Sequence, residues 1–325
     1  SPGSTLLITK NGEVNVSGIT LITNDAKADV TQLGVFDTDE LAIGYEGNGT
    51  LLVTSGGRVI VRDIELGLET TESQGTLNII GKNTLVSTDE IEVGKEGSGI
   101  LNLSQGGSLT ADSSIFAGYG ANSKGNITVN NGSITANDLI IGDAGNGKLT
   151  ISEGRVAIAN NANIAQKSGS KGEVTVDGSK SVLSAKIISV GAEGDGTLTV
   201  SNGGIVDATT NDANDVGAVF VSSSSLGKGL ANITGNGSKI LTNEMIIGDM
   251  AQSNGTLNIS KGAEVSVDKV MRVADDFSST GTVNINDGSL SIPDLTVGYG
   301  GKGTLIAKKA KINADLKRKN KIWKR

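Results

Sequence analysis

One short pattern, a glycine followed by aliphatic residues at alternate positions, recurs through almost the whole chain. Alternation of apolar and polar residues is the period of a half-buried β-strand. Successive copies lie about 25 residues apart, and a fixed repeat of this length indicates a unit that stacks on copies of itself. Gly12 (GEVNV) opens the series, which continues at Gly49, Gly75, Gly99, Gly125, Gly147, Gly172, Gly196, Gly229, Gly255, Gly281 and Gly303.

Each repeat predicts three short strands. The first carries inward aliphatic residues, such as Leu149 and Ile151, and the second follows a glycine turn, as in 57-GRVIV-61. The third ends in an aliphatic-x-aliphatic-glycine motif, as in 139-LIIG-142. Strands this short do not form an independent sheet, but stacked coils bury a continuous aliphatic core. We therefore predict an all-β fold, a parallel β-helix (β-solenoid) of about 12 three-strand coils.

The composition limits the chemistry that this fold can carry. Glycine accounts for 47 of 325 residues, aromatic residues for 2%, and there is no cysteine or histidine. The core must therefore consist of valine, isoleucine and leucine. A disulfide framework and the Ser-His and Cys-His mechanisms are excluded, and a metal site would need oxygen ligands alone. We expect no cofactor, no metal and no enzymatic activity.

The segment 142-GDAGNGKLTISEG-154 tests this interpretation, because Gly142, Gly145 and Gly147 resemble a phosphate-binding loop. Such a loop must lead into a helix whose N-terminal amides hold the anion. Here the glycines lead into a strand pattern, and the triplet recurs at the spacing of the coils. We therefore expect these glycines to form a corner of the solenoid.

Departures from the repeat indicate where loops project and where function is expected. The step from Gly12 to Gly49 has an excess at 24–40, and the step from Gly196 to Gly229 has one at 209–215. The expected organisation is an N-terminal coil or cap with an insertion at 1–40, β-helix repeats at 41–307 and a basic tail or linker at 308–325. The acidic pairs in turns, which a glycan-active enzyme would need, are Asp275 with Asp276 and Asp212 with Asp215. The candidate partner-binding residues of the 209–215 loop are Asn211, Asp212 and Asp215.

The C-terminal segment differs in charge from the rest. Residues 302–325 carry a net charge of +9, which leaves −16 on the remainder of a chain whose total is −7. A basic segment of this kind favours contact with a polyanion such as a glycosaminoglycan, or serves as a solvated linker. Its candidate partner-binding residues are Lys317, Arg318, Lys319, Lys321, Trp323, Lys324 and Arg325.

The consensus I-G-x-x-G-x-G-T-L-x-V-x-x-G-G-x-V resembles the repeats of Gram-negative type V autotransporter passengers, which are shared with PEP-CTERM exported proteins. It is carried by 43-IGYEGNGTLLVTSGGRV-59 and 190-VGAEGDGTLTVSNGGIV-206, and the resemblance covers about residues 40–307. The family implies a right-handed β-helix and display on, or release from, the outer membrane. It also implies a C-terminal translocator barrel as a partner, which is absent here, so the chain is expected to be a passenger or part of one.

Three functions follow from this interpretation. The first is a non-enzymatic adhesin or virulence factor, secreted or on the bacterial cell surface, that binds a host cell-surface protein or glycosaminoglycan and no nucleic acid. The second is a released passenger that activates a host receptor as a ligand. The third is a glycan-active enzyme on the surface of the helix.

Overall fold

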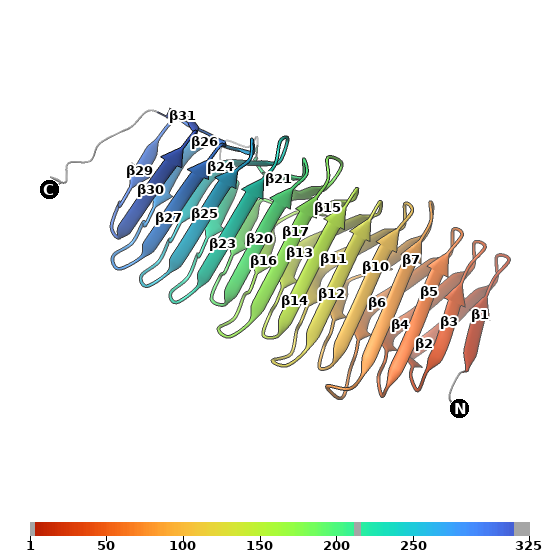
Figure 1. Cartoon of the computed structure of the whole chain (residues 1–325). Helices are drawn as coiled ribbons and strands as arrows, with labels where there is room; N and C mark the ends of the chain where they lie inside the picture. The colour runs from red at the N-terminus through yellow and green to blue at the C-terminus, as the bar shows by residue number, and fades with distance from the viewer. Residues whose placement is uncertain (1–3, 211–215, 315–325) are drawn as a thin grey trace, which may run out of the picture.

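The structure, a computed structural model, describes residues 4–210 and 216–314 of the chain. Their regular structure consists entirely of β-strands, which stack coil on coil into a rod with β1 (Thr5–Ile8) and β31 (Lys311–Ala314) at opposite ends (Figure 1). All strand pairs between successive coils are parallel, as in β12 (Lys124–Asn130) beside β14 (Asn146–Ser152). The predicted parallel β-solenoid is therefore confirmed.

The first strands of the coils form one sheet along the length of the rod. From Gly49 to Gly303 its glycine anchors are ladder partners at every step, as Gly125 is of Gly147 and Gly147 of Gly172. Leu149 and Ile151 point inward and are fully buried, which confirms the predicted inward pair. In order, the strands are β1, β3 (Ala26–Val30), β5 (Asn48–Thr54), β7 (Gln74–Ile80), β10 (Ser98–Ser104), β12, β14, β17 (Lys171–Asp177), β20 (Asp195–Ser201), β23 (Lys228–Thr234), β25 (Asn254–Ser260), β27 (Thr280–Asn286) and β30 (Lys302–Lys308).

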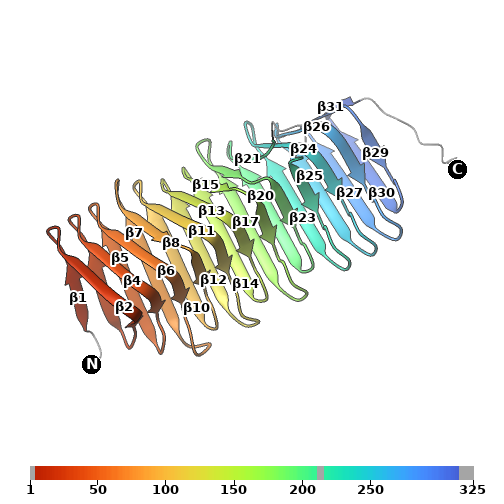
Figure 2. The ribbon, with the colours of Figure 1, turned by 180° about the vertical axis from the view of Figure 1, so that it is seen from behind.

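The second and third predicted strands belong to a second hydrogen-bonded sheet, which lies behind the first in the view of Figure 1 and is seen from the other side in Figure 2. In many coils they merge into one long strand that bends without a glycine turn. At the bend in β4 the hydroxyl of Thr38 can donate to the carbonyl of Glu40 or of Gly18. The hydroxyl of Thr88, the last residue of β8, can likewise donate to the carbonyl of Glu90 or of Arg62. The strands are β2 (Glu13–Ile22), β4 (Val35–Ile43), β6 (Arg58–Leu66), β8 (Leu85–Thr88), β9 (Glu90–Val93), β11 (Ser108–Ala117), β13 (Ser133–Ile141), β15 (Arg155–Ile158), β16 (Asn161–Ile164), β18 (Val182–Ser184), β19 (Ile187–Val190), β21 (Ile205–Ala208), β22 (Ala218–Val221), β24 (Lys239–Ile247), β26 (Glu264–Val273), β28 (Ser289–Ile292), β29 (Leu295–Val297) and β31.

The N-terminal end differs from the prediction. Gly12 precedes β2 and receives a hydrogen bond from Val35, just as Gly34 receives one from Arg58, so it occupies a second-strand position. The segment 24–40 forms β3 and most of β4, which are an ordinary coil. The expected insertion at 24–40 is therefore wrong, and the solenoid extends from β1 to β31, beyond the expected limits 41–307.

The insertion near 209–215 falls between β21 and β22, at the bend of the second sheet. The side-chain oxygen of Asn243, itself buried, accepts hydrogen bonds from the amides of Thr210 (2.8 Å) and Gly217 (3.1 Å). A single asparagine thus joins the two ends of the loop while the coil around it keeps its normal register with β24.

Candidate functional site

The outward side chains of the third strands form a row along the rod. In the aliphatic-x-aliphatic-glycine motif both aliphatic residues point into the core, so residue x points outward. In β6 this residue is Glu65, between buried Ile64 and Leu66. Ladder pairing places the equivalent residues of successive coils side by side. From β2 to β13 the row consists of Leu21, Ala42, Glu65, Glu92, Phe116 and Ile140.

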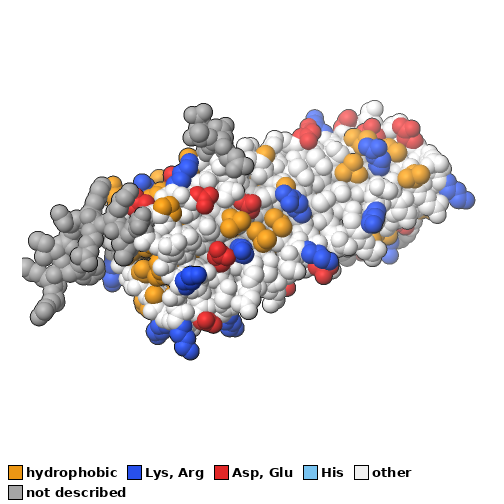
Figure 3. Space-filling view, turned by 90° about the horizontal axis from the view of Figure 1, so that it is seen from above, with side chains coloured by type: hydrophobic (Ala, Val, Ile, Leu, Met, Phe, Trp, Pro, Cys, Tyr) orange, Lys and Arg blue, Asp and Glu red, His pale blue; other side chains and the backbone are white. Residues whose placement is uncertain are grey.

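A second outward row lies two residues earlier on the same strands. Its residues on β2, β4, β6 and β9 are Ile19, Glu40, Asp63 and Glu90, each the ladder partner of the next. Together the two rows place an apolar pair on β2 beside five carboxylates on β4, β6 and β9. Hydrophobic and acidic side chains accordingly gather near the N-terminal end of the rod (Figure 3).

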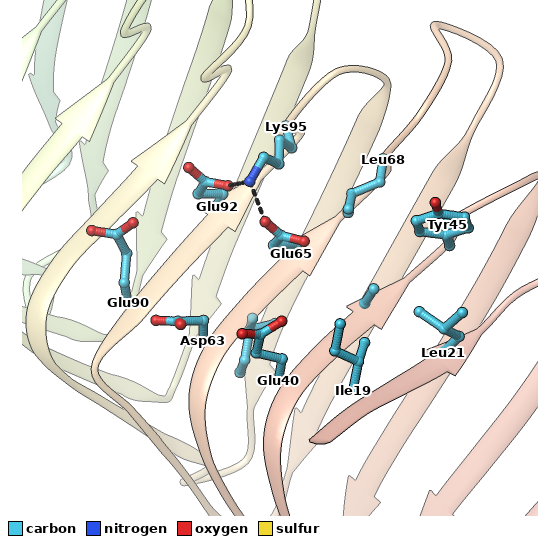
Figure 4. A pocket seen from close by; sticks show the side chains of 12 residues that line it. Ile19, Leu21, Glu40, Tyr45, Asp63, Glu65, Leu68, Glu90, Glu92 and Lys95 are labelled. Atoms are coloured by element: carbon cyan, nitrogen blue, oxygen red, sulfur yellow. Dashed lines mark hydrogen bonds and ion pairs between the residues drawn. The ribbon is translucent and has the colours of Figure 1, made fainter.

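The rows form the floor of a pocket of about 460 Å³ (Figure 4). The corners that follow the third strands, which carry Tyr45, Leu68 and Lys95, form one wall of the pocket. Glu92 therefore is only 6% exposed although its side chain points away from the core. At the opposite side Ile19 and Leu21 are 61% and 48% exposed. The lining residues are Ile19, Leu21, Glu40, Ala42, Tyr45, Asp63, Ile64, Glu65, Leu68, Glu90, Glu92 and Lys95, which we call the acidic groove.

Negative charge exceeds positive charge in the acidic groove. The ammonium of Lys95 lies between Glu65 and Glu92, with its Nζ 2.8 Å from an oxygen of Glu92. At the outer side Arg62 pairs with Glu40 and with Asp63. Glu90 makes no ion pair or side-chain hydrogen bond to any residue that the structure describes. Two cations therefore face five carboxylates, and the floor keeps a net negative charge.

The pKa values follow from burial and from this crowding. Burial raises the pKa of Glu92 above its ordinary value, although the hydrogen bond and charge of Lys95 oppose the rise. Burial, and then the negative charge of Asp63, raise the pKa of Glu90. Burial lowers the pKa of Lys95, but its hydrogen bonds to Glu65 and Glu92 raise it by more, so it stays cationic. The groove is thus an environment that favours the arrival of a further positive charge.

Beyond Lys95 the row continues with an aromatic pair. The rings of Phe116 and Tyr119 meet edge to face with centroids 5.2 Å apart. The ammonium groups of Lys95 and Lys167 lie 6.0 and 5.9 Å from the centroid of Tyr119. Lys167 also pairs at 2.6 Å with buried Asp143. This closed set of contacts ends the acidic groove on its C-terminal side.

A second acidic cluster lies at the corners after β24 and β26. Arg272 places its guanidinium carbon 5.5 Å from the ring centroid of Tyr299 and its Nε 3.6 Å from an oxygen of Asp275. Burial, and then the charges of Asp275 and Asp276, raise the pKa of Asp249 to about 6. The structure therefore brings the predicted pair Asp275 and Asp276 together with a third carboxylate.

This shift predicts how stability depends on pH. The pKa of Asp249 is higher in the folded state than the unfolded 3.8, so protonation stabilises the fold below that value and the gain is lost as the pH rises through about 6. Asp249→Asn should therefore raise the free energy of unfolding at pH 7 by roughly 1–2 kcal/mol, allowing for partial solvation. Denaturation between pH 4 and pH 8 measures this, with exposed Asp268→Asn as control. Parallel pH profiles for Asp249→Asn and the parent would contradict the prediction.

The remaining predicted site residues have different outcomes. Asn211, Asp212 and Asp215 lie outside the described residues, as do Lys317, Arg318, Lys319, Lys321, Trp323, Lys324 and Arg325. Residues 142–145 form a corner between β13 and β14, as predicted, and lead into the strand β14. Residues 4–210 and 216–314 contain no group of acidic side chains suited to a metal ion, and no helix that could cross a membrane.

Sequence reasoning missed the acidic groove. Its signal is the glutamate in 64-IELG-67 and 91-IEVG-94, which fills the same repeat position in successive coils. Glu65 and Glu92 are far apart in sequence and become neighbours only through stacking of β6 on β9.

No protein-family model matches the chain, and neither the curated proteins nor the solved structures include one with significant similarity to it.

Proposed function

We propose that this protein is a non-enzymatic binding rod whose acidic groove receives a cationic segment of a partner protein. The observation that carries the proposal is the excess of carboxylates over cations beside an exposed apolar wall. A lysine or arginine side chain satisfies the carboxylates, and a neighbouring aliphatic or aromatic residue covers Ile19 and Leu21. A polyanion such as a glycosaminoglycan is repelled at this site, so the groove favours a protein partner.

We further propose that the rod is secreted or displayed on a bacterial surface as an autotransporter passenger, where it serves as an adhesin. The consensus repeat supports this, because it resembles that of passengers, and a stacked solenoid suits the presentation of a groove at a distance from its attachment. Fractionation of the native organism, followed by mass spectrometry of the culture supernatant and outer membrane, tests it. Recovery in the cytoplasmic fraction alone would contradict the proposal.

Neutralising the groove should weaken binding. The probe is a labelled peptide of alternating lysine and isoleucine, titrated against the full chain by fluorescence anisotropy. The double variant Glu65→Gln, Glu90→Gln removes two negative charges from the floor, and we expect its Kd to rise at least about tenfold. Binding should also weaken with added salt, because charge attraction is screened.

The matched control is Asp268→Asn, Glu173→Gln, which removes the same charge from exposed positions on β26 and β17, outside the acidic groove. This variant should bind the peptide as the parent does. A peptide of alternating lysine and serine should bind more weakly, since it cannot cover the apolar wall. Equal loss in both double variants would show that net charge, rather than the groove, attracts the peptide.

A glycan-active enzyme is the second candidate, and one observation favours it. Asp63 and Glu90 are ladder partners, so two carboxylates project side by side from neighbouring strands, and a glycosidase needs a pair of carboxyl groups. Burial raises the pKa of Glu90, as a general acid requires. Incubation with a glycan panel tests this: product release that Glu90→Gln abolishes would replace the binding proposal, and no release would remove the candidate.

A further inference from the structure

The acidic groove and β31, the last described strand, lie at opposite ends of the rod. The groove is built on β2, β4, β6 and β9, in the first coils, whereas β31 belongs to the last coil (Figure 1). Residues 315–325 follow β31 in the sequence. This segment, DLKRKNKIWKR, contains six lysines and arginines and a single acid, with Ile322 and Trp323 among them. We propose that residues 317–325 of one copy bind the acidic groove of a second copy, so that the rods associate head to tail.

The acidic groove and residues 317–325 are complementary in charge and in apolar surface. The groove offers carboxylates with too few cations, and the carboxylate of Glu90 makes no ion pair or hydrogen bond with the described residues. The segment offers closely spaced lysines and arginines, which pair with carboxylates. Its Ile322 and Trp323 supply apolar surface for Ile19 and Leu21, which are largely exposed.

The segment cannot reach the groove of its own copy. Between β9 and the coil of β31 the ladder takes nine steps, through β11, β13, β16, β19, β22, β24, β26 and the coil of β28 and β29, which is roughly 43 Å at the spacing of neighbouring strands. Fully extended, the chain from Ala314 to Arg325 spans about 36–40 Å at most, and the apolar wall on β2 lies three further ladder steps beyond β9. The contact therefore joins two copies.

The contact uses different surfaces on the two copies, so it does not close a dimer. Each copy that binds a neighbour through its groove still presents its own basic segment at the other end. A contact of this kind propagates into a line of rods unless rotation closes a ring. The association rests on the proposed function, because it assigns the protein's own basic segment as an occupant of the same groove.

Sedimentation velocity of the full chain at low salt should show a sedimentation coefficient that rises with protein concentration, and added salt should reverse the rise. Two variants separate the two halves of the contact. The groove variant Glu65→Gln, Glu90→Gln keeps an intact basic segment, and the tail variant Lys319→Glu, Lys321→Glu, Trp323→Ala keeps an intact groove. Each alone should remain monomeric, and an equimolar mixture should form one-to-one dimers and nothing larger.

The outcomes separate this inference from the proposed function. A parent protein that stays monomeric at all concentrations, while its groove binds the lysine-isoleucine peptide, overturns the inference and leaves the proposed function standing. Assembly that the tail variant abolishes but the groove variant retains places the contact elsewhere on the rod and also overturns it. Failure of both assembly and peptide binding rejects both proposals. Circular dichroism of each variant should match the parent, and the one-to-one mixture shows that both variants are folded.

Discussion

Gly142→Ala should lower the free energy of unfolding of the coils around β13 and β14 by about 3–5 kcal/mol. Gly142 has φ = +80°, a conformation that costs an L-residue with a side chain about 1–2 kcal/mol. An added Cβ would also lie 2.2 Å from the carbonyl oxygen of Lys171 and 2.7 Å from its carbon, and both atoms belong to the backbone of the next coil. The corner can accept the methyl group only if the two coils separate.

The matched control is Gly169→Ala. Gly169 has φ = +83°, so it shares the backbone conformation, but nothing lies within 4 Å of an added Cβ. Its cost should be about 1–2 kcal/mol, from conformation alone. Thermal denaturation ranks the two variants, and native-state hydrogen exchange should show the loss of protection in Gly142→Ala centred on β13, β14 and β17. Equal costs for the two substitutions would show that close approach between coils does not fix the corner.

The stacking of coils could be predicted from sequence because two independent signals agree in the repeats from Gly49 to Gly303. The period of two assigns Leu149 and Ile151 to the core, and the glycine two residues before Leu149 fixes where that strand begins. An added Cβ on Gly147 would lie 2.1 Å from the amide nitrogen of Gly142, so the anchor of this coil requires glycine. The conformation of each strand and the packing between coils thus favour the same residues at these positions.

The same local signal explains the error at Gly12. The pattern glycine-x-aliphatic-x-aliphatic occurs on second strands as well, for instance in 57-GRVIV-61, since both strands place alternate residues in the core. Only the ladder partner separates the two positions, and Gly12 aligns with Gly34 and Gly57. The missing first strand, β3, begins with Ala26 where later coils have glycine, so the anchor pattern passes over it.

The acidic groove escaped prediction for a different reason. Within one coil, an outward glutamate such as Glu65 is what a half-buried strand requires, and it carries no further signal. The part that Glu65 plays in the groove depends on Glu92 in the next coil and on the corner that carries Lys95. Architecture depends on a periodicity that each repeat displays, whereas this site depends on differences between neighbouring repeats at one position.

Lys95→Met should destabilise the protein and yet strengthen the binding of a basic peptide. Without the ammonium, Glu92 becomes a carboxylate whose side chain is 8% exposed and has no cation beside it. Removing one member of a buried ion pair costs about 3–5 kcal/mol; Lys95 itself is 30% exposed, so we expect about 2–3 kcal/mol here. The loss should be local to β6, β9 and β11 in hydrogen exchange, and detectable in thermal denaturation.

A double-mutant cycle assigns the cost to the unpaired carboxylate. Adding Glu92→Gln to Lys95→Met should restore most of the lost stability, with a coupling between the two changes of about 1–3 kcal/mol. Acid should restore it as well. Burial already raises the pKa of Glu92 above its unfolded value, and loss of Lys95 removes the influence that lowers it. The folded state then binds the proton more tightly, so the destabilisation is present at pH 7 and disappears as the pH falls toward about 4.3.

Peptide binding should become stronger, because Lys95 neutralises part of the negative charge with which a basic ligand would otherwise pair. Lys95→Met leaves Glu65 and Glu92 free to pair with the incoming lysine, so the Kd of the lysine-isoleucine peptide should fall severalfold, the reverse of the change expected for Glu65→Gln, Glu90→Gln. Damage to the fold alone would weaken binding in both variants. Lower stability together with tighter binding therefore identifies Lys95 as the cation that a partner's basic residue replaces, and weaker binding in Lys95→Met would exclude that role.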